Sequence, residues 1–211
     1  MLQDTVCKLA PIEGITENRN LIKTVDMKKC TITIIYLIIS FYYVSAQIST
    51  ADIKNYSQRM NSILQSKYGT SYPSFVVTDL NGDTITEKQL HGKITLINFW
   101  FEECAPCIAE IPALNQLYLK YRDIPKFQLL SFIRERPEDA VKCIQRFEIS
   151  YPLYPIPGNK VYPLCFYLGF PTNIIIDTTG KVVFITTGGP TDPEKARESV
   201  RMLEEKMIEL L

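Results

Sequence analysis

Two cysteines with the spacing Cys-x-x-Cys, Cys104 and Cys107, carry the clearest chemistry in this 211-residue sequence. They follow the apolar run 94–101, which is rich in β-formers and predicts a buried strand. Apolar residues then recur every three positions from Ile108 and predict a helix, whose N-terminal N–H groups and dipole favour a thiolate over a thiol. We therefore expect dithiol–disulfide exchange, with Cys104 exposed as the attacking nucleophile and Cys107, one turn inward, as the resolving thiol.

Two other roles for this cysteine pair are a structural disulfide and half of a zinc site. A zinc site needs about four ligands, and the sequence has neither a second Cys-x-x-Cys nor a pair of histidines. The single histidine, His91, also argues against Ser-His and Cys-His catalysis. We expect no metal and no cofactor other than the redox-active disulfide itself.

Composition and charge narrow the class of protein. The chain is 46% hydrophobic with a formal net charge of zero, which favours one globular domain and no nucleic-acid partner. Two further cysteines, Cys143 and Cys165, are expected to be buried thiols, and a second disulfide between them stays open.

The N-terminal part predicts export. Lys28 and Lys29 precede the uncharged run 31–44 and a small-residue site ending at Ala46, the pattern of a signal peptide. The run is shorter than the roughly 20 residues of a spanning helix, so cleavage is favoured over membrane anchoring through residues 31–46. Acidic residues ahead of Met27 indicate that residues 1–26 are an over-extended start. Residues 1–46 are thus a leader, and the mature protein is expected to be periplasmic or extracytoplasmic.

The remaining chain must build the strand and helix that hold the cysteines. Residues 47–72 predict a helix and linker, with Thr50 or Asp52 as N-cap, and this helix is expected to pack on the domain that follows. Residues 73–211 predict that domain, which starts with a β-hairpin closed by a turn at Asn81-Gly82. Strands are then expected at 94–100, 126–133, 151–154, 173–177 and 182–185, and helices after Cys104, from Pro137 and from Pro193. This order predicts an α/β fold with a mixed central sheet and helices on both faces.

At this point the chain resembles the thioredoxin-like superfamily, in particular its exported TlpA/ResA-like branch of thiol–disulfide oxidoreductases. Four stretches carry the resemblance and together span roughly residues 73–210. They are Gly92-Lys-Ile-Thr-Leu-Ile-Asn-Phe-Trp100, Cys104-Ala-Pro-Cys107, Glu110-Ile-Pro112, and Gly169-Phe-Pro-Thr172 with Ile175-Ile-Asp-Thr-Thr-Gly180.

The resemblance implies a thioredoxin-like fold with an added N-terminal helix and β-hairpin. It implies that Pro171 is cis and faces the cysteines across a substrate groove, which Phe170, Pro106 and Trp100 help to shape, although Trp100 is also a natural core residue. Phe170 would offer its backbone to an incoming peptide strand. Glu110 would take the proton of the resolving thiol, its alternative being a solvated helix carboxylate.

One departure from the family bears on the direction of electron flow. Glu103 stands where the family has Trp, and Glu102 precedes it. Carboxylates near a forming thiolate raise its pKa and disfavour the reduced pair, so we expect a reductant. Its partners would be disulfide-containing proteins of the cell envelope and an upstream membrane electron donor.

Two other functional classes stay open. One is a redox-inert binding module with the same fold. The other is a peroxiredoxin-like peroxidase, whose peroxidatic cysteine needs a threonine three residues upstream, where this chain has Phe101.

Overall fold

The computed structural model describes the backbone of residues 27–211 and their side chains except at 27–30, 44–51 and 53. The predicted over-extended start, residues 1–26, lies outside this range. In chain order the elements are α1 (Met27–Lys67), β1 (Val76–Thr78), β2 (Thr84–Thr86), the 3-10 helix η1 (Glu87–Leu90), β3 (Ile94–Trp100), α2 (Ala105–Tyr121), β4 (Phe127–Ile133), α3 (Pro137–Phe147), β5 (Leu153–Pro155), the 3-10 helix η2 (Gly158–Lys160), α4 (Val161–Leu164), β6 (Thr172–Ile176), β7 (Val182–Thr187) and α5 (Pro193–Ile208). The chain divides into two units at Tyr56 and Ser57.

The helix α1 corrects one expectation. It is a single helix of 41 residues, so Thr50 and Asp52 lie inside it and do not cap a separate helix. The cause is local, because no glycine or proline between Met27 and Lys67 interrupts the helix. Large apolar side chains between Ile32 and Tyr43 are exposed. Within the described residues, no helix has both the length and the apolar character that crossing a bilayer requires.

The second unit, Ser57–Leu211, begins with the last turns of α1. Met60, Leu64 and Tyr68 pack against an apolar cluster of this unit, as expected for this part of the helix. Gly69 follows with φ +74°, a conformation that glycine adopts without strain and that ends helices.

A mixed five-stranded sheet forms the centre of this unit, with the order β5-β4-β3-β6-β7. β3 runs parallel to β4 and antiparallel to β6, and all seven of its residues are buried. The predicted hairpin forms a separate two-stranded sheet of β1 and β2. Its connection is not a two-residue Asn-Gly turn, because the Asp79 carboxylate accepts from the N–H groups of Asn81 and Asp83 and closes a longer loop.

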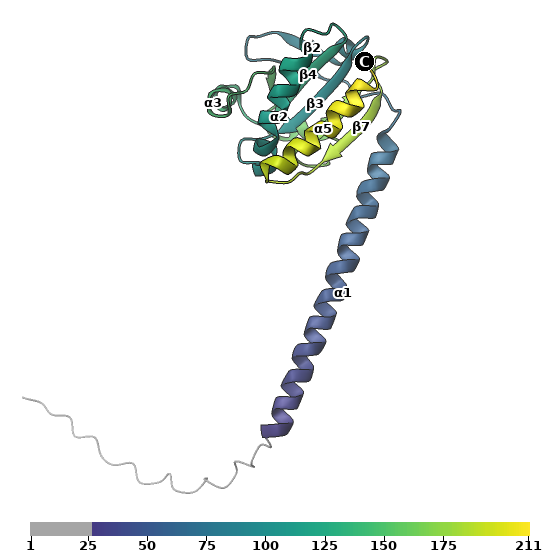
Figure 1. Ribbon diagram of the computed structural model, residues 1–211, viewed down its shortest axis with the longest axis vertical. Helices are drawn as coiled ribbons and strands as arrows, with labels where there is room; N and C mark the ends of the chain where they lie inside the picture. Colours follow the sequence, from purple (N-terminus) through teal and green to yellow (C-terminus); the bar gives the residue numbers. More distant parts are fainter. Residues whose placement is uncertain (1–26) are drawn as a thin grey trace, which may run out of the picture. The chain divides into compact units, whose positions relative to one another are not determined.

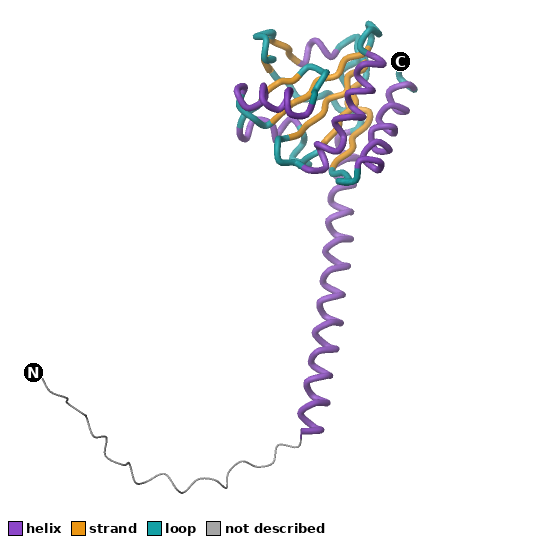
Figure 2. Tube along the Cα trace, turned by 60° about the vertical axis from the view of Figure 1, so that its left-hand side comes forward, coloured by secondary structure: helices purple, strands orange, loops and turns teal. Residues whose placement is uncertain are grey.

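Apolar side chains from alternate positions of the strands form one cluster on each face of the sheet. One cluster includes residues of α2, α3 and α5, and α2 lies beside α5 on this face (Figures 1 and 2). The other contains residues of β1, η1 and α4 and the end of α1. Cys143 belongs to the first cluster and Cys165 to the second. Both are free buried thiols, so the open alternative of a second disulfide between them is not realised.

Candidate active site

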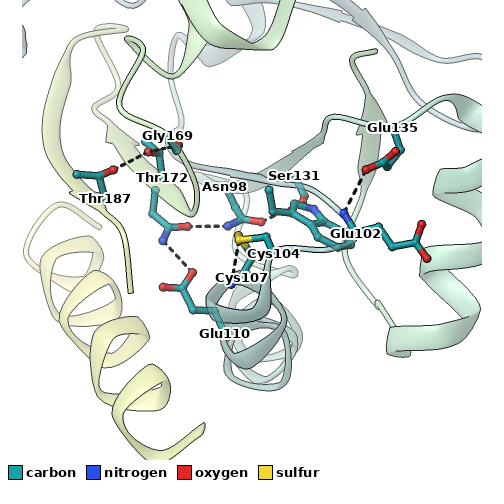
Figure 3. The surroundings of a disulfide bond; sticks show 12 residues. Asn98, Glu102, Cys104, Cys107, Glu110, Ser131, Glu135, Gly169, Thr172 and Thr187 are labelled. Atoms are coloured by element: carbon teal, nitrogen blue, oxygen red, sulfur yellow. Dashed lines mark hydrogen bonds between the residues drawn. A yellow bond between two sulfur atoms is a disulfide. The ribbon is translucent and has the colours of Figure 1, made fainter. Parts of the chain in front are cut away.

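The end of β3 and the start of α2 bring the two cysteines together. Cys104 is the N-cap of α2 and forms a disulfide with Cys107, their Cα atoms 5.2 Å apart (Figure 3). The backbone N–H of Cys107 points at Sγ of Cys104, 3.3 Å away, and this N–H is one that a helix leaves unpaired. Pro106 fits the first turn because it has no N–H to leave unpaired. A thiolate on Cys104 would therefore be stabilised by the helix terminus.

The expectation that Cys104 is exposed is wrong for this disulfide form. Cys104 retains 4% of its accessible surface and Cys107 retains 2%. The two residues belong to the apolar cluster under α2, and the rings of Phe101 and Phe170 pack against that cluster, 5.4 Å apart. Phe170 comes from a loop distant in the sequence, so the spacing of the cysteines could not predict this packing.

The loop before β6 lies next to the disulfide and is tightly held. The peptide bond between Phe170 and Pro171 is cis. Thr172 donates through its hydroxyl to the carbonyl of Gly169 at 2.8 Å, and the N–H of Gly188 donates to the carbonyl of Pro171 at 2.8 Å. Pro171 is buried and Phe170 half-buried. Within residues 27–211, neither the N–H nor the C=O of Phe170 has a hydrogen-bond partner.

Glu110 lies on the same face of α2 as Cys107, three residues further on (Figure 3). It is only 2% exposed, and this burial raises the pKa of its carboxyl to about 7. One oxygen, Oε2, accepts a hydrogen bond of 3.1 Å from Asn173, which opposes the rise. The other faces Gly189, where an added Cβ would lie 3.4 Å from Oε1 and 3.4 Å from Pro171. Glu110 is thus a buried carboxyl that is partly ionised near neutral pH, and not a solvated one.

The remaining predicted site residues divide into surface and core. Pro106 is half-buried beside the disulfide. Trp100 is 1% exposed and cannot line a substrate groove, so its place among the groove residues is corrected to the core. Its indole N–H donates to the hydroxyl of Ser131 at 2.9 Å.

Sequence reasoning missed Asn173 and Ser131. They lie opposite Asn98 on the two neighbouring strands, and a chain of side-chain hydrogen bonds joins them to Glu110. The sequence shows only that each apolar strand contains polar residues. Thr95, Gln128 and Thr172 accompany Asn98, Ser131 and Asn173, and the strand register that aligns the latter three is not visible there.

The two acidic residues before the cysteines have different surroundings. Glu102 pairs with Arg146 at 2.8 Å, and Glu103 is exposed. Since Arg146 offsets the charge of Glu102, the expected effect of this carboxylate on the Cys104 thiolate is weakened. Within the described part of the chain, no group of three or more His, Cys, Asp or Glu side chains is placed to hold a metal ion.

The AhpC/TSA family model matches residues 68–185, more than half of the chain. The chain belongs to the AhpC/TSA family. A curated relative from Geobacillus kaustophilus, thiol-disulfide oxidoreductase ResA, is 32% identical over 135 residues, which cover 63% of this chain and 78% of the relative.

Other relatives agree with this family assignment. ResA from Bacillus cereus is 36% identical over 116 residues, which are 54% of this chain and 66% of the relative, slightly less than two thirds of its length. The thioredoxin domain of a thiol-disulfide oxidoreductase from Bacteroides vulgatus is similar in structure, with a TM-score of 0.53 and 26% identity over 64% of this chain and 96% of that one. A thiol:disulfide interchange protein from a Bacteroides species has the same TM-score and identity and covers 64% and 88%. The expected thioredoxin-like α/β fold is thereby confirmed, and these relatives are named as thiol–disulfide oxidoreductases or a thiol:disulfide interchange protein.

Proposed function

We propose that this protein reduces disulfides in other proteins by dithiol–disulfide exchange at Cys104 and Cys107. The observation that carries the proposal is the disulfide at the N-cap of α2 with the buried carboxyl of Glu110 on the same helix face. The helix terminus stabilises a thiolate at Cys104, and a carboxyl with a pKa of about 7 can accept and return a proton near neutral pH.

The reaction starts from the reduced pair. The Cys104 thiolate attacks one sulfur of a client disulfide, so that a Cys104–client bond forms, the client bond breaks and one client thiolate leaves. Cys107 then gives its proton to Glu110 and attacks Sγ of Cys104. The intramolecular disulfide forms, the second client thiolate leaves and takes up a proton, and two electrons have passed to the client. A dithiol donor must return these electrons before the next cycle.

The client is proposed to lie along the cis-proline loop. The backbone N–H and C=O of Phe170 have no partner in the described residues, and an extended client segment could pair with them as an added strand. Pro106 and Pro171 would flank the client sulfur on either side. We further propose that the clients are envelope proteins and the donor is a membrane protein, which follows from the export pattern of the leader and the ResA relatives.

A trapping experiment tests this mechanism. In the full chain carrying Cys107→Ser, the Cys104 thiolate should attack the disulfide of insulin and stop at a stable mixed disulfide, visible as a mass increase that a reductant removes. The matched variant Cys143→Ser should give no such adduct, because its junction pair resolves it. A redox-inert binding module, which the burial of Cys104 would suit, would give no adduct with either variant.

A separate variant tests the role of Glu110 in this experiment. With both junction cysteines present, Glu110→Gln should prolong the life of the mixed disulfide by roughly 100-fold, the usual range for losing a general base. An unchanged lifetime would remove Glu110 from the mechanism and leave the exchange reaction standing.

A further inference from the structure

A row of buried polar side chains crosses the sheet and leads to Glu110. Asn98 on β3 is the direct register partner of Ser131 on β4 and of Asn173 on β6, and Trp100 lies two residues beyond Asn98. Each of these residues and Glu110 is at most 2% exposed. Polar groups this deeply buried need hydrogen-bond partners, and these residues supply one another.

Every hydrogen bond in this row is donated in the same direction, toward Glu110. Trp100 Nε1 donates to Ser131 Oγ at 2.9 Å, and Ser131 Oγ donates to Asn98 Oδ1 at 3.1 Å. Asn98 Nδ2 donates to Asn173 Oδ1 at 2.8 Å, and Asn173 Nδ2 donates to Glu110 Oε2 at 3.1 Å. Hydrogen bonds aligned in this way polarise one another, so each strengthens the next.

Trp100 determines this direction because an indole N–H can only donate. The Ser131 hydroxyl accepts from it and gives its own hydrogen to the carbonyl oxygen of Asn98. The amide nitrogen of Asn98 is then left for Asn173, whose oxygen accepts, and Asn173 must turn its own nitrogen to Glu110. A donor facing a carboxyl favours its ionised form, whereas an amide oxygen there would favour the protonated form.

We propose that Ser131, Asn98 and Asn173 are positioning residues that, oriented from Trp100, hold an amide donor on Glu110 and keep its carboxylate available to accept a proton. This role rests on the proposed function, because the arrangement would serve the proton transfer from Cys107 to Glu110. The orientation itself exists in the resting disulfide form and can be measured without turnover.

The other groups around Glu110 add no competing charge. Cys107, on the same helix, is held in the disulfide, and Tyr151, ahead of β5, is a neutral phenol whose pKa is raised by burial and further by Glu110. Thr186 on β7 accepts a second, longer hydrogen bond of 3.4 Å from Asn173. Burial raises the pKa of Glu110 and the Asn173 amide lowers it, and among the described residues no charged side chain of α5 contributes.

The test is a carbon-13 NMR titration of the Glu110 carboxyl in the oxidised, full-length protein, assigned with Glu110→Gln. The wild-type carboxyl should titrate near pH 7. Asn173→Leu removes the donor and should raise the midpoint by roughly one pH unit or more, the worth of a hydrogen bond to a charged group. Ser131→Ala and Trp100→Phe leave Asn173 in place but remove a hydrogen bond that fixes its orientation. Ser131→Ala should raise the midpoint by less than Asn173→Leu does, and Trp100→Phe by less than Ser131→Ala does.

Two matched variants separate orientation from general damage. Ser131→Thr keeps the hydroxyl and should keep the wild-type midpoint. Thr95→Val removes a different buried hydroxyl, on β3. This hydroxyl accepts from Gln128 and has no link to Glu110, so its loss should also leave the midpoint unchanged. A midpoint that stays at the wild-type value in Ser131→Ala and Trp100→Phe would overturn the proposal, even if Asn173→Leu fails to fold. Because no exchange is measured, this result is independent of the trapping experiment.

Discussion

The two cysteines at the strand–helix junction and the two in the apolar clusters are similarly buried but lie in different surroundings. Cys104 and Cys107 are 4% and 2% exposed, and Cys143 and Cys165 are both at 0%. At the junction, each sulfur has a second sulfur in bonding range, and Cys104 also has a helix-terminal N–H directed at it. In the clusters, burial raises the pKa of Cys143 to about 11 and also raises the pKa of Cys165.

Burial alone therefore does not separate the two cysteines proposed to react from the other two. What distinguishes the junction is the start of α2, which favours a thiolate at Cys104, and the buried carboxyl of Glu110, to which the proposed mechanism assigns the proton transfer. Cys143 and Cys165 lie in the apolar clusters, where the Cys165 thiol donates to the carbonyl of Tyr162 at 3.4 Å, and we expect both to serve as small core residues.

Alkylation rates should show the largest difference between the two regions. In the reduced, folded protein at pH 8, a thiol with a pKa of about 11 is thiolate in only about one molecule in a thousand, so Cys143 should react with iodoacetamide on the order of 100-fold more slowly than Cys104. Peptide mass spectrometry after timed quenching measures both rates in one sample. Equal rates at the two positions would contradict the proposed difference between the junction and the apolar clusters.

Glu110 lies at the junction, and its raised pKa should make the free energy of unfolding depend on pH. The pKa of its carboxyl is about 7 in the folded protein against an ordinary 4.5, so the folded state holds the proton more tightly. Stability from this group is therefore greatest below about pH 4.5 and is lost as the pH rises through 7. Between pH 5 and pH 8 the free energy of unfolding should fall by about 2 kcal/mol more in the wild type than in Glu110→Gln.

Urea unfolding of both proteins at the two pH values measures this difference. Acidic groups with lowered pKa, such as Asp177 and Glu204, titrate below this window and are shared by both proteins, so they cancel. If the two proteins lose stability equally, Glu110 does not have a raised pKa in the folded state.

The parts of the site that depend on local sequence could be predicted, and those that depend on register could not. The spacing of Cys104, Cys107 and Glu110 along one helix places them on neighbouring turns whatever the rest of the chain does. The line of Ser131, Asn98 and Asn173 needs three strands aligned within one residue, which no local pattern encodes.

Fold prediction shows the same division. The mixed sheet and its two helix-covered faces follow from element order, but the strand order does not. The unbroken α1 was missed because two segments of different character join without a glycine or proline between them. The burial of Cys104 was missed because the apolar cluster that contains it, with Phe170 packed against it, forms only on folding.

The most direct test of the central claim is whether the junction pair turns over. The full-length protein, recycled by dithiothreitol, should accelerate the reduction of insulin disulfides, followed by the turbidity of the precipitating chains. Cys104→Ser should reduce the rate to that of dithiothreitol alone, and the double variant Cys143→Ser, Cys165→Ser should keep the wild-type rate. A wild-type protein no faster than dithiothreitol, or a Cys104→Ser variant as fast as the wild type, would contradict the account.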